Sequence, residues 1–140
     1  MKLYFMIGLP TETEEDLKAI VELSNKIIKE GKQVNPRAKI TVNVSTFVPK
    51  KNTPFENEKM IGLEEIKKKQ DFLKHDLKHR SIDLKWHAPE MSVVEGLLSA
   101  GNESTGRVIE KVFEQGAKFE NWREHFDYSR WEKAIAENKS

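Results

Sequence analysis

Cysteine is absent from all 140 residues of the chain. Disulfides, cysteine nucleophiles and thiolate-held metal clusters are therefore excluded within this chain. An excess of one charge is also missing, because 24 Lys and Arg residues oppose 23 Asp and Glu residues. A net charge of +1 predicts no strong attraction of the whole chain to nucleic acid or to acidic membranes.

Long hydrophobic runs are missing too. No stretch approaches the roughly 18 apolar residues that a membrane helix needs. The apolar segment 3–7 meets the turn Gly8-Leu9-Pro10 and not a small-residue cleavage site, so we predict no secretory signal. We expect a cytoplasmic protein.

Apolar residues make up 37% and charged residues 34% of the chain, as in a soluble domain with one core. Strand and helix patterns alternate through the first 87 residues, and only helices follow. The expected strands are 3–7, 40–48 and 82–86; the expected helices are 14–31, 63–79, and three that begin near Pro89, Ser104 and Ser129. This alternation predicts a parallel α/β sheet, as a slice of a barrel or of an open sheet.

The first strand is apolar at every position from Leu3 to Ile7. Such a run is typical of a strand that is buried on both faces of a parallel sheet. We therefore expect this strand to occupy an interior position in a larger fold.

The loop 8–13 follows that strand, at the edge where parallel α/β folds place their sites. Gly8 would let a ligand approach the backbone, and Glu12 could accept hydrogen bonds from a ligand. A purely structural alternative stays open, in which Gly8 and Pro10 make the turn and Glu12 and Thr13 cap the next helix. The glycine patterns of dinucleotide- and nucleotide-binding loops are both missing.

Several ordered motifs resemble one family. Segment 2–17, with Gly-Leu-Pro-Thr-Glu-Thr, resembles the fifth-strand segment of radical S-adenosylmethionine enzymes, and segment 44–55 resembles the sixth strand and its exit loop. The tail segments 86–92, 95–99 and 122–127 resemble a poorly characterised subgroup that carries a cobalamin-binding-like segment before the radical domain. The resemblance spans essentially the whole chain.

This resemblance implies a fold and a cofactor. Residues 1–87 would be the C-terminal part of a partial (β/α)6 TIM-like barrel with about three parallel strands, and residues 88–140 a small family-specific helical tail. The cofactor would be S-adenosylmethionine. The residues implied to contact it are Gly8, Pro10 and Glu12 for the adenosyl part and the backbone of Val48 and Pro49 for the adenine.

Thr53 and Phe55 would line the rim near the substrate. One departure from the family is decisive: without cysteine, this chain cannot hold the family's [4Fe–4S] cluster. We therefore expect a C-terminal fragment that supplies cofactor and substrate walls and is inactive alone, with the cluster in the parent protein. Its expected partner is the missing N-terminal half, or a second copy, at an exposed strand edge along Leu3–Ile7.

Two other patterns in the sequence would fit a zinc site or an RNA-binding face. His75 and His79, at i and i+4 on a predicted helix with His87 nearby, resemble a zinc spacing, but the surrounding lysines favour a solvated face and we predict no metal. The same basic face could contact RNA, although interleaved acidic residues dilute its charge. A non-catalytic partner- or RNA-binding module is thus the alternative function.

The tail is rich in aromatic residues. Trp122, His125, Phe126 and Trp131 could form a binding surface, but such a cluster more often forms a small core that holds a tail down. His125 beside Asp127 is a candidate acid–base pair.

Overall fold

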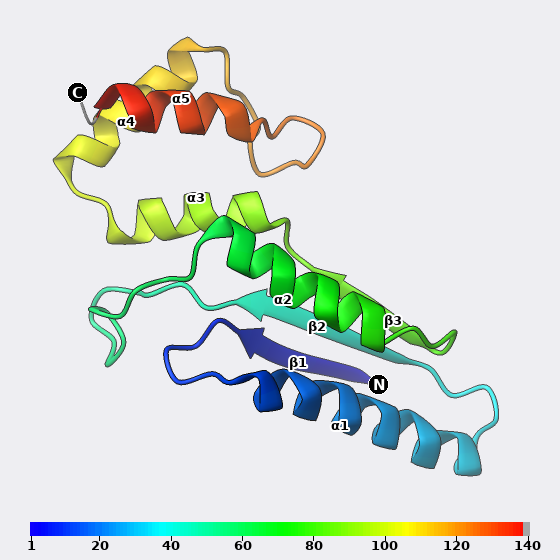
Figure 1. Cartoon of the computed structure of the whole chain (residues 1–140). Coiled ribbons are helices and arrows are strands. Elements are labelled where there is room, and N and C mark those ends of the chain that lie inside the picture. Colours follow the sequence, from blue (N-terminus) through cyan, green and yellow to red (C-terminus); the bar gives the residue numbers. More distant parts are fainter. Residues whose placement is uncertain (139–140) are drawn as a thin grey trace.

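The computed structural model describes residues 1–138 and contains three strands and five helices in that part of the chain (Figure 1). In chain order they are β1 (Lys2–Ile7), α1 (Glu14–Val34), β2 (Ile40–Thr46), α2 (Leu63–Asp76), β3 (Ile82–Trp86), α3 (Pro89–Ala100), α4 (Glu103–Glu114) and α5 (Tyr128–Asn138). No helix within residues 1–138 is both long enough and apolar enough to cross a bilayer.

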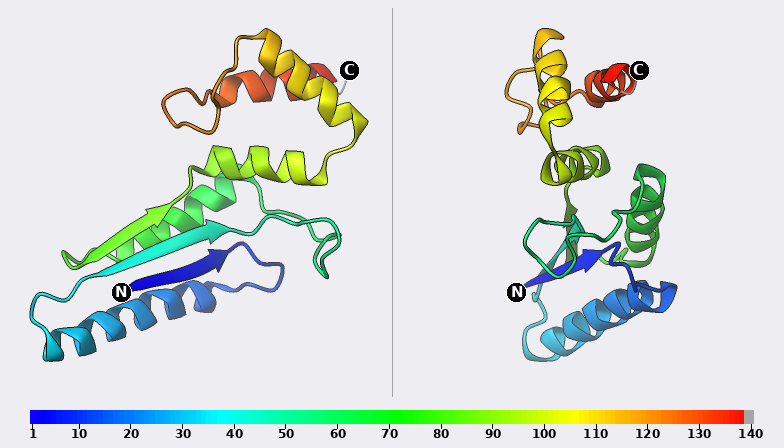
Figure 2. Two further views of the ribbon diagram at one scale, coloured as in Figure 1. Left: turned by 180° about the vertical axis from the view of Figure 1, so that it is seen from behind. Right: turned by 90° about the vertical axis from the view of Figure 1, so that its left-hand side faces the viewer.

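The strands form one parallel sheet in the order β1-β2-β3. In register, Tyr4 lies beside Asn43, and Asn43 lies beside Lys85. Helices α1 and α2 both cover the same face of this sheet (Figure 2). The predicted parallel α/β sheet is therefore confirmed.

Alternation along the strands separates two faces. Ile7, Val42 and Val44 point toward the helices and are at most 3% exposed. On the opposite face, Tyr4 is 74% and Met6 is 46% exposed. The prediction that β1 is buried on both faces is therefore wrong, because no described element covers its second face.

Helix α1 begins as the sequence predicts. Thr13 and Asp16 form a capping box, and the Asp16 carboxylate accepts hydrogen bonds from the Thr13 amide and hydroxyl at 2.7 and 2.8 Å. The predicted end at Gly31 is wrong, since the helix continues to Val34. Proline 36 disfavours helical backbone at the residue before it, and Asn35 is accordingly extended.

Other boundaries also shift. Strand β2 ends at Thr46, before the predicted Val48, and α2 ends at Asp76, before the predicted His79. Helix α4 is capped by Asn102, whose side chain accepts from the Ser104 amide at 2.9 Å, and not by Ser104.

The tail helices pack around a second small core, which lies beyond the β3 edge of the sheet (Figures 1 and 2). Val108 and Val112 of α4 are buried there, as expected. Ile109 and Phe113 were expected to point inward, but they are 45% and 67% exposed. A helix that packs chiefly against one neighbour, α5, buries only a narrow i, i+4 stripe.

Candidate functional site at the carboxyl ends of the strands

The loop after β1 turns at Gly8, which has φ +82°. A Cβ atom at this position would lie 2.7 Å from Ile61 Cδ1, so a larger residue would clash as well as strain the backbone. The absent side chain therefore makes room for Ile61. The sequence prediction had assigned that space to an approaching ligand.

Glu12 fastens this loop to helix α2. Its Oε2 accepts the Gly8 N–H at 2.8 Å, and its Oε1 accepts a hydrogen bond from Lys69 Nζ at 2.7 Å. The Glu12 side chain is only 5% exposed and that of Lys69 is 15% exposed. Glu12 thus has a structural role, but in the loop itself and not as a helix cap, which Thr13 and Asp16 provide.

The predicted adenine-contacting residues lie next to this loop. The Phe47 amide donates to the Ile7 carbonyl at 2.8 Å, which holds the carboxyl ends of β1 and β2 side by side. Val48 and Pro49 follow directly and are half-buried. The fold therefore brings the Gly8 and Val48 segments together.

The predicted rim residues lie in the long β2–α2 loop. The Phe55 ring packs edge-on against Phe47 with 5.9 Å between centroids, and it stays 47% exposed. The Thr53 hydroxyl donates to the Lys50 carbonyl at 2.7 Å, which shapes the turn. Lys50 Nζ also bonds Glu95 and Ser99 of α3, each at 2.7 Å, and so ties the loop to the tail.

A hollow of about 480 Å³ opens at this edge of the sheet. Its walls are the β1–α1 loop from Gly8 to Glu12, residues 57–61 of the long loop, and Glu65 and Lys69 of α2. It contains three predicted cofactor residues, Gly8, Pro10 and Glu12.

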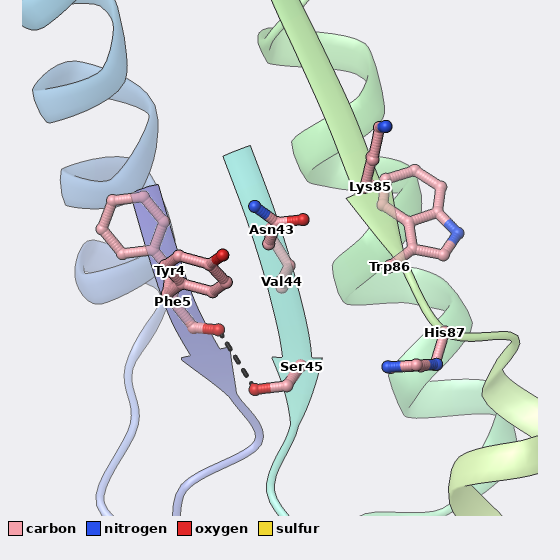
Figure 3. Close-up of a pocket in the computed structure, with 8 residues that line it drawn as sticks. All are labelled: Tyr4, Phe5, Asn43, Val44, Ser45, Lys85, Trp86 and His87. Atoms are coloured by element: carbon pink, nitrogen blue, oxygen red, sulfur yellow. Dashed lines mark hydrogen bonds between the residues drawn. The ribbon is translucent and has the colours of Figure 1, made fainter. Parts of the chain in front are cut away.

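A second hollow, of about 270 Å³, lies on the uncovered face of the sheet (Figure 3). Tyr4, Asn43, Ser45, Lys85 and His87 line it from three neighbouring strands and the residue after β3. Sequence reasoning missed this set. The signal was the alternation of polar residues in the second and third strands, but only their register shows that these residues share a face.

The zinc and RNA alternatives find little geometric support. His79 lies beyond the end of α2, so His75 and His79 do not share a helix face as predicted. No group of three potential metal-ligating side chains occurs within residues 1–138. The basic run is also divided, because Lys69 turns inward to Glu12 and Lys67 lies 3.1 Å from Glu90, whose carboxylate raises the pKa of Lys67.

The aromatic residues of the tail divide into two groups. Trp131 and Phe126 belong to the tail core, as expected, and Trp131 Nε1 donates to Glu120 at 2.9 Å. Trp122 and His125 instead lie outside and contact Phe119, with tilted rings and centroid distances of 6.0 to 6.2 Å. The expected small core therefore contains only half of the predicted cluster.

Asp127 is engaged by its own helix terminus. Its Oδ1 accepts from the Ser129 hydroxyl at 2.7 Å and from the Ser129 amide at 3.0 Å. The hydroxyl bond first, and then the amide bond, lower the pKa of Asp127. These contacts give Asp127 a capping role at α5, so the geometry does not favour the predicted acid–base pair with His125.

Comparison with known proteins gives a relative that is itself uncharacterised. The chain is 31% identical over 110 residues to an uncharacterised protein of Methanocaldococcus jannaschii, a match that covers 79% of this chain and 23% of that protein. The chain thus spans about a quarter of the length of the curated relative that it matches. No family model and no solved structure matches the chain.

Proposed function

We propose that this chain is the C-terminal part of a radical S-adenosylmethionine enzyme and forms part of its cofactor and substrate walls. The observation that carries the proposal is the joined carboxyl edge, where the Phe47–Ile7 bond holds the Gly8 loop beside Val48 and Pro49. These are the two segments whose sequences resemble the fifth and sixth strands of that family.

The placement of the helices supports a barrel wall. Both helices that pack on the sheet lie on one face, and the other face is open and largely polar. A doubly wound sheet carries helices on both faces, whereas a barrel keeps them outside. We therefore propose that residues 1–87 belong to a partial (β/α)6 barrel whose lumen is the open face.

The roles of the site residues follow from their positions. Gly8, Pro10, Val48 and Pro49 would form the cofactor wall, while Glu12 would hold the loop in shape and not contact the cofactor. Thr53 and Phe55 would form the substrate rim. The thiolate ligands of an iron–sulfur cluster are missing from this chain, so we assign no reductive step to it.

The edge of β1 is the proposed contact with the rest of the enzyme. Carbonyls of Met1 and Ile7 accept bonds from the β2 side, at Thr41 and Phe47. Because hydrogen-bonding direction alternates along a parallel strand, the backbone groups of the even-numbered residues point to the free edge. A further parallel strand, from the missing N-terminal half or a second copy, would satisfy them.

Calorimetric titration of S-adenosylmethionine into the chain tests the cofactor wall. We expect weak binding, because only part of the site is present. A Pro10→Ala variant, which removes an exposed ring from the proposed cofactor wall, should weaken it, whereas Phe119→Ala, which removes an exposed tail ring, should not. Equal affinity for the two variants, or no binding even at millimolar ligand, would count against a cofactor wall in this chain.

A further inference from the structure

The hollow on the open sheet face has an unusual lining. Its eight residues include no Asp or Glu, although 23 of the 140 residues are acidic. Lys85, His87, the Tyr4 hydroxyl and the Asn43 amide supply hydrogen-bond donors instead. Such a set of donors without a carboxylate suits an anionic group.

Several of these side chains are fixed by neighbours. Asn43 Nδ2 donates to the Leu3 carbonyl at 3.3 Å, which orients the amide and leaves its second N–H free to donate. The Ser45 hydroxyl donates to the Phe5 carbonyl at 3.3 Å, which holds the side chain at the floor of the hollow. In Figure 3, the ring of Tyr4 extends from β1 toward β2, and the ring of His87 extends toward β2 from the residue after β3.

His87 has a distinctive position. Gln70 of α2, only 4% exposed, donates to the His87 carbonyl at 3.3 Å and holds this residue at the carboxyl end of β3. The same histidine also lines a hollow of about 380 Å³ toward α3 and the tail, beside Phe126 and Trp131. His87 therefore lies where the open sheet face meets a second hollow, which is lined by apolar side chains and also by Glu95 and Glu120.

Lys85, the lysine of this lining, is held only weakly by its neighbour Asp83. Lys85 Nζ lies 3.3 Å from Asp83, but both side chains are 61% exposed. An exposed pair of this kind is worth little, so an anion could recruit Lys85 at small cost.

We infer that the open sheet face binds an oxyanion, a carboxylate or phosphate carried by the substrate, between Lys85, His87 and Asn43. This inference rests on the proposed function in taking the open face as the ligand face, but it requires no radical chemistry. The hollow beyond His87 would receive an uncharged part of the same molecule, against Phe126 and Trp131.

NMR titration of the chain with inorganic phosphate and, separately, with acetate tests the inference at constant pH and ionic strength. The four histidines serve as internal probes, since His75, His79 and His125 lie outside the hollow. We expect saturable shifts of the His87 ring and the Asn43 side-chain amide. The stronger of the two anions would identify the group that the site prefers.

Lys85→Met should weaken that binding about tenfold, the equivalent of losing one charge-assisted hydrogen bond. Lys133→Met makes the same change on the exposed side of α5 and should have no effect. Equal shifts of all four histidines, shifts that do not saturate, or equal affinities of the two variants would overturn the inference. S-adenosylmethionine binding is measured in a separate experiment. Failure of the oxyanion site would therefore not refute the proposed cofactor wall, and failure of the cofactor wall would not refute the oxyanion site.

Discussion

At the residue scale, Glu12 shows how geometry changes the meaning of a motif. A carboxylate after a strand end suggested a ligand contact, yet both of its oxygens are used by Gly8 and Lys69. Because the Glu12 side chain is only 5% exposed, its remaining acceptor sites are hardly accessible to a ligand. Its effect on a cofactor would therefore be indirect, through the shape of the loop.

The Lys69→Met variant should lower the free energy of unfolding by about 2 kcal/mol, because it leaves the Glu12 carboxylate buried without its cation. Lys68→Met, at the exposed neighbouring position, should change stability little. Urea denaturation of the two variants measures the difference. Equal stabilities would show that the pair is not structural.

For Ser24 we expect the opposite effect, a substitution that raises the free energy of unfolding. It is fully buried in α1, and its hydroxyl lacks a hydrogen-bond partner among the described residues. Ser24→Ala should therefore stabilise the protein by about 0.5 to 1 kcal/mol, since alanine also favours helix more. Ser129→Ala, which removes the bond to Asp127, should destabilise it. Thermal unfolding of both variants tests the prediction, and a destabilising Ser24→Ala would contradict it.

At the scale of elements, side-chain periodicity located all eight elements within residues 1–138, but it did not predict where several of them end. Helix α1 passes through Gly31 and ends before Pro36, because a local backbone constraint outweighs the preference of glycine for helix ends. Ile109 and Phe113 fit the apolar stripe of α4, yet they lie outside the narrow contact with α5. Periodicity finds an apolar stripe without indicating how much of it a neighbour covers.

The cap of α1 predicts a pH dependence. Hydrogen bonds from the Thr13 amide, and then from its hydroxyl, lower the pKa of Asp16 from 3.8. The stability that this carboxylate contributes is therefore present above pH 3.8 and lost as the pH falls through the lower folded-state pKa.

Asp16→Asn should therefore lower the thermal midpoint at neutral pH, and its difference from the unmodified chain should shrink toward about pH 2. Asp71→Asn, on the exposed face of α2, serves as the control. Thermal unfolding over this pH range measures the effect. A difference that does not change with pH would argue against a role for the Asp16 charge.

At the scale of the whole molecule, the sheet ends at β1, whose outer edge pairs with no other described strand. Leu3 and Phe5 of β1 are only partly buried, whereas Val42 and Val44 of the central strand are at most 3% exposed. A strand edge with free backbone groups and flanking apolar residues promotes association.

We therefore expect concentration-dependent association of the chain in analytical ultracentrifugation. Met6→Pro should reduce it, because the Met6 amide points to the free edge and its loss spares the bonds to β2. Phe5→Pro should instead destabilise the sheet, since the Phe5 amide faces β2. A monomer at every concentration would refute self-association through this edge.

The sequence by itself determined the α/β class, the parallel strands, the helical tail and the absence of a thiolate-held cluster, because periodicity and residue type act locally. The resemblance placed the Gly8 and Val48 segments at one cofactor, and this stays a prediction. Only the tertiary structure decided that Glu12 pairs with Lys69, 57 positions away, and that Tyr4, Asn43 and Lys85 share an open face. These features depend on strand register and on which face the helices cover, and both are set by contacts between residues distant in the chain.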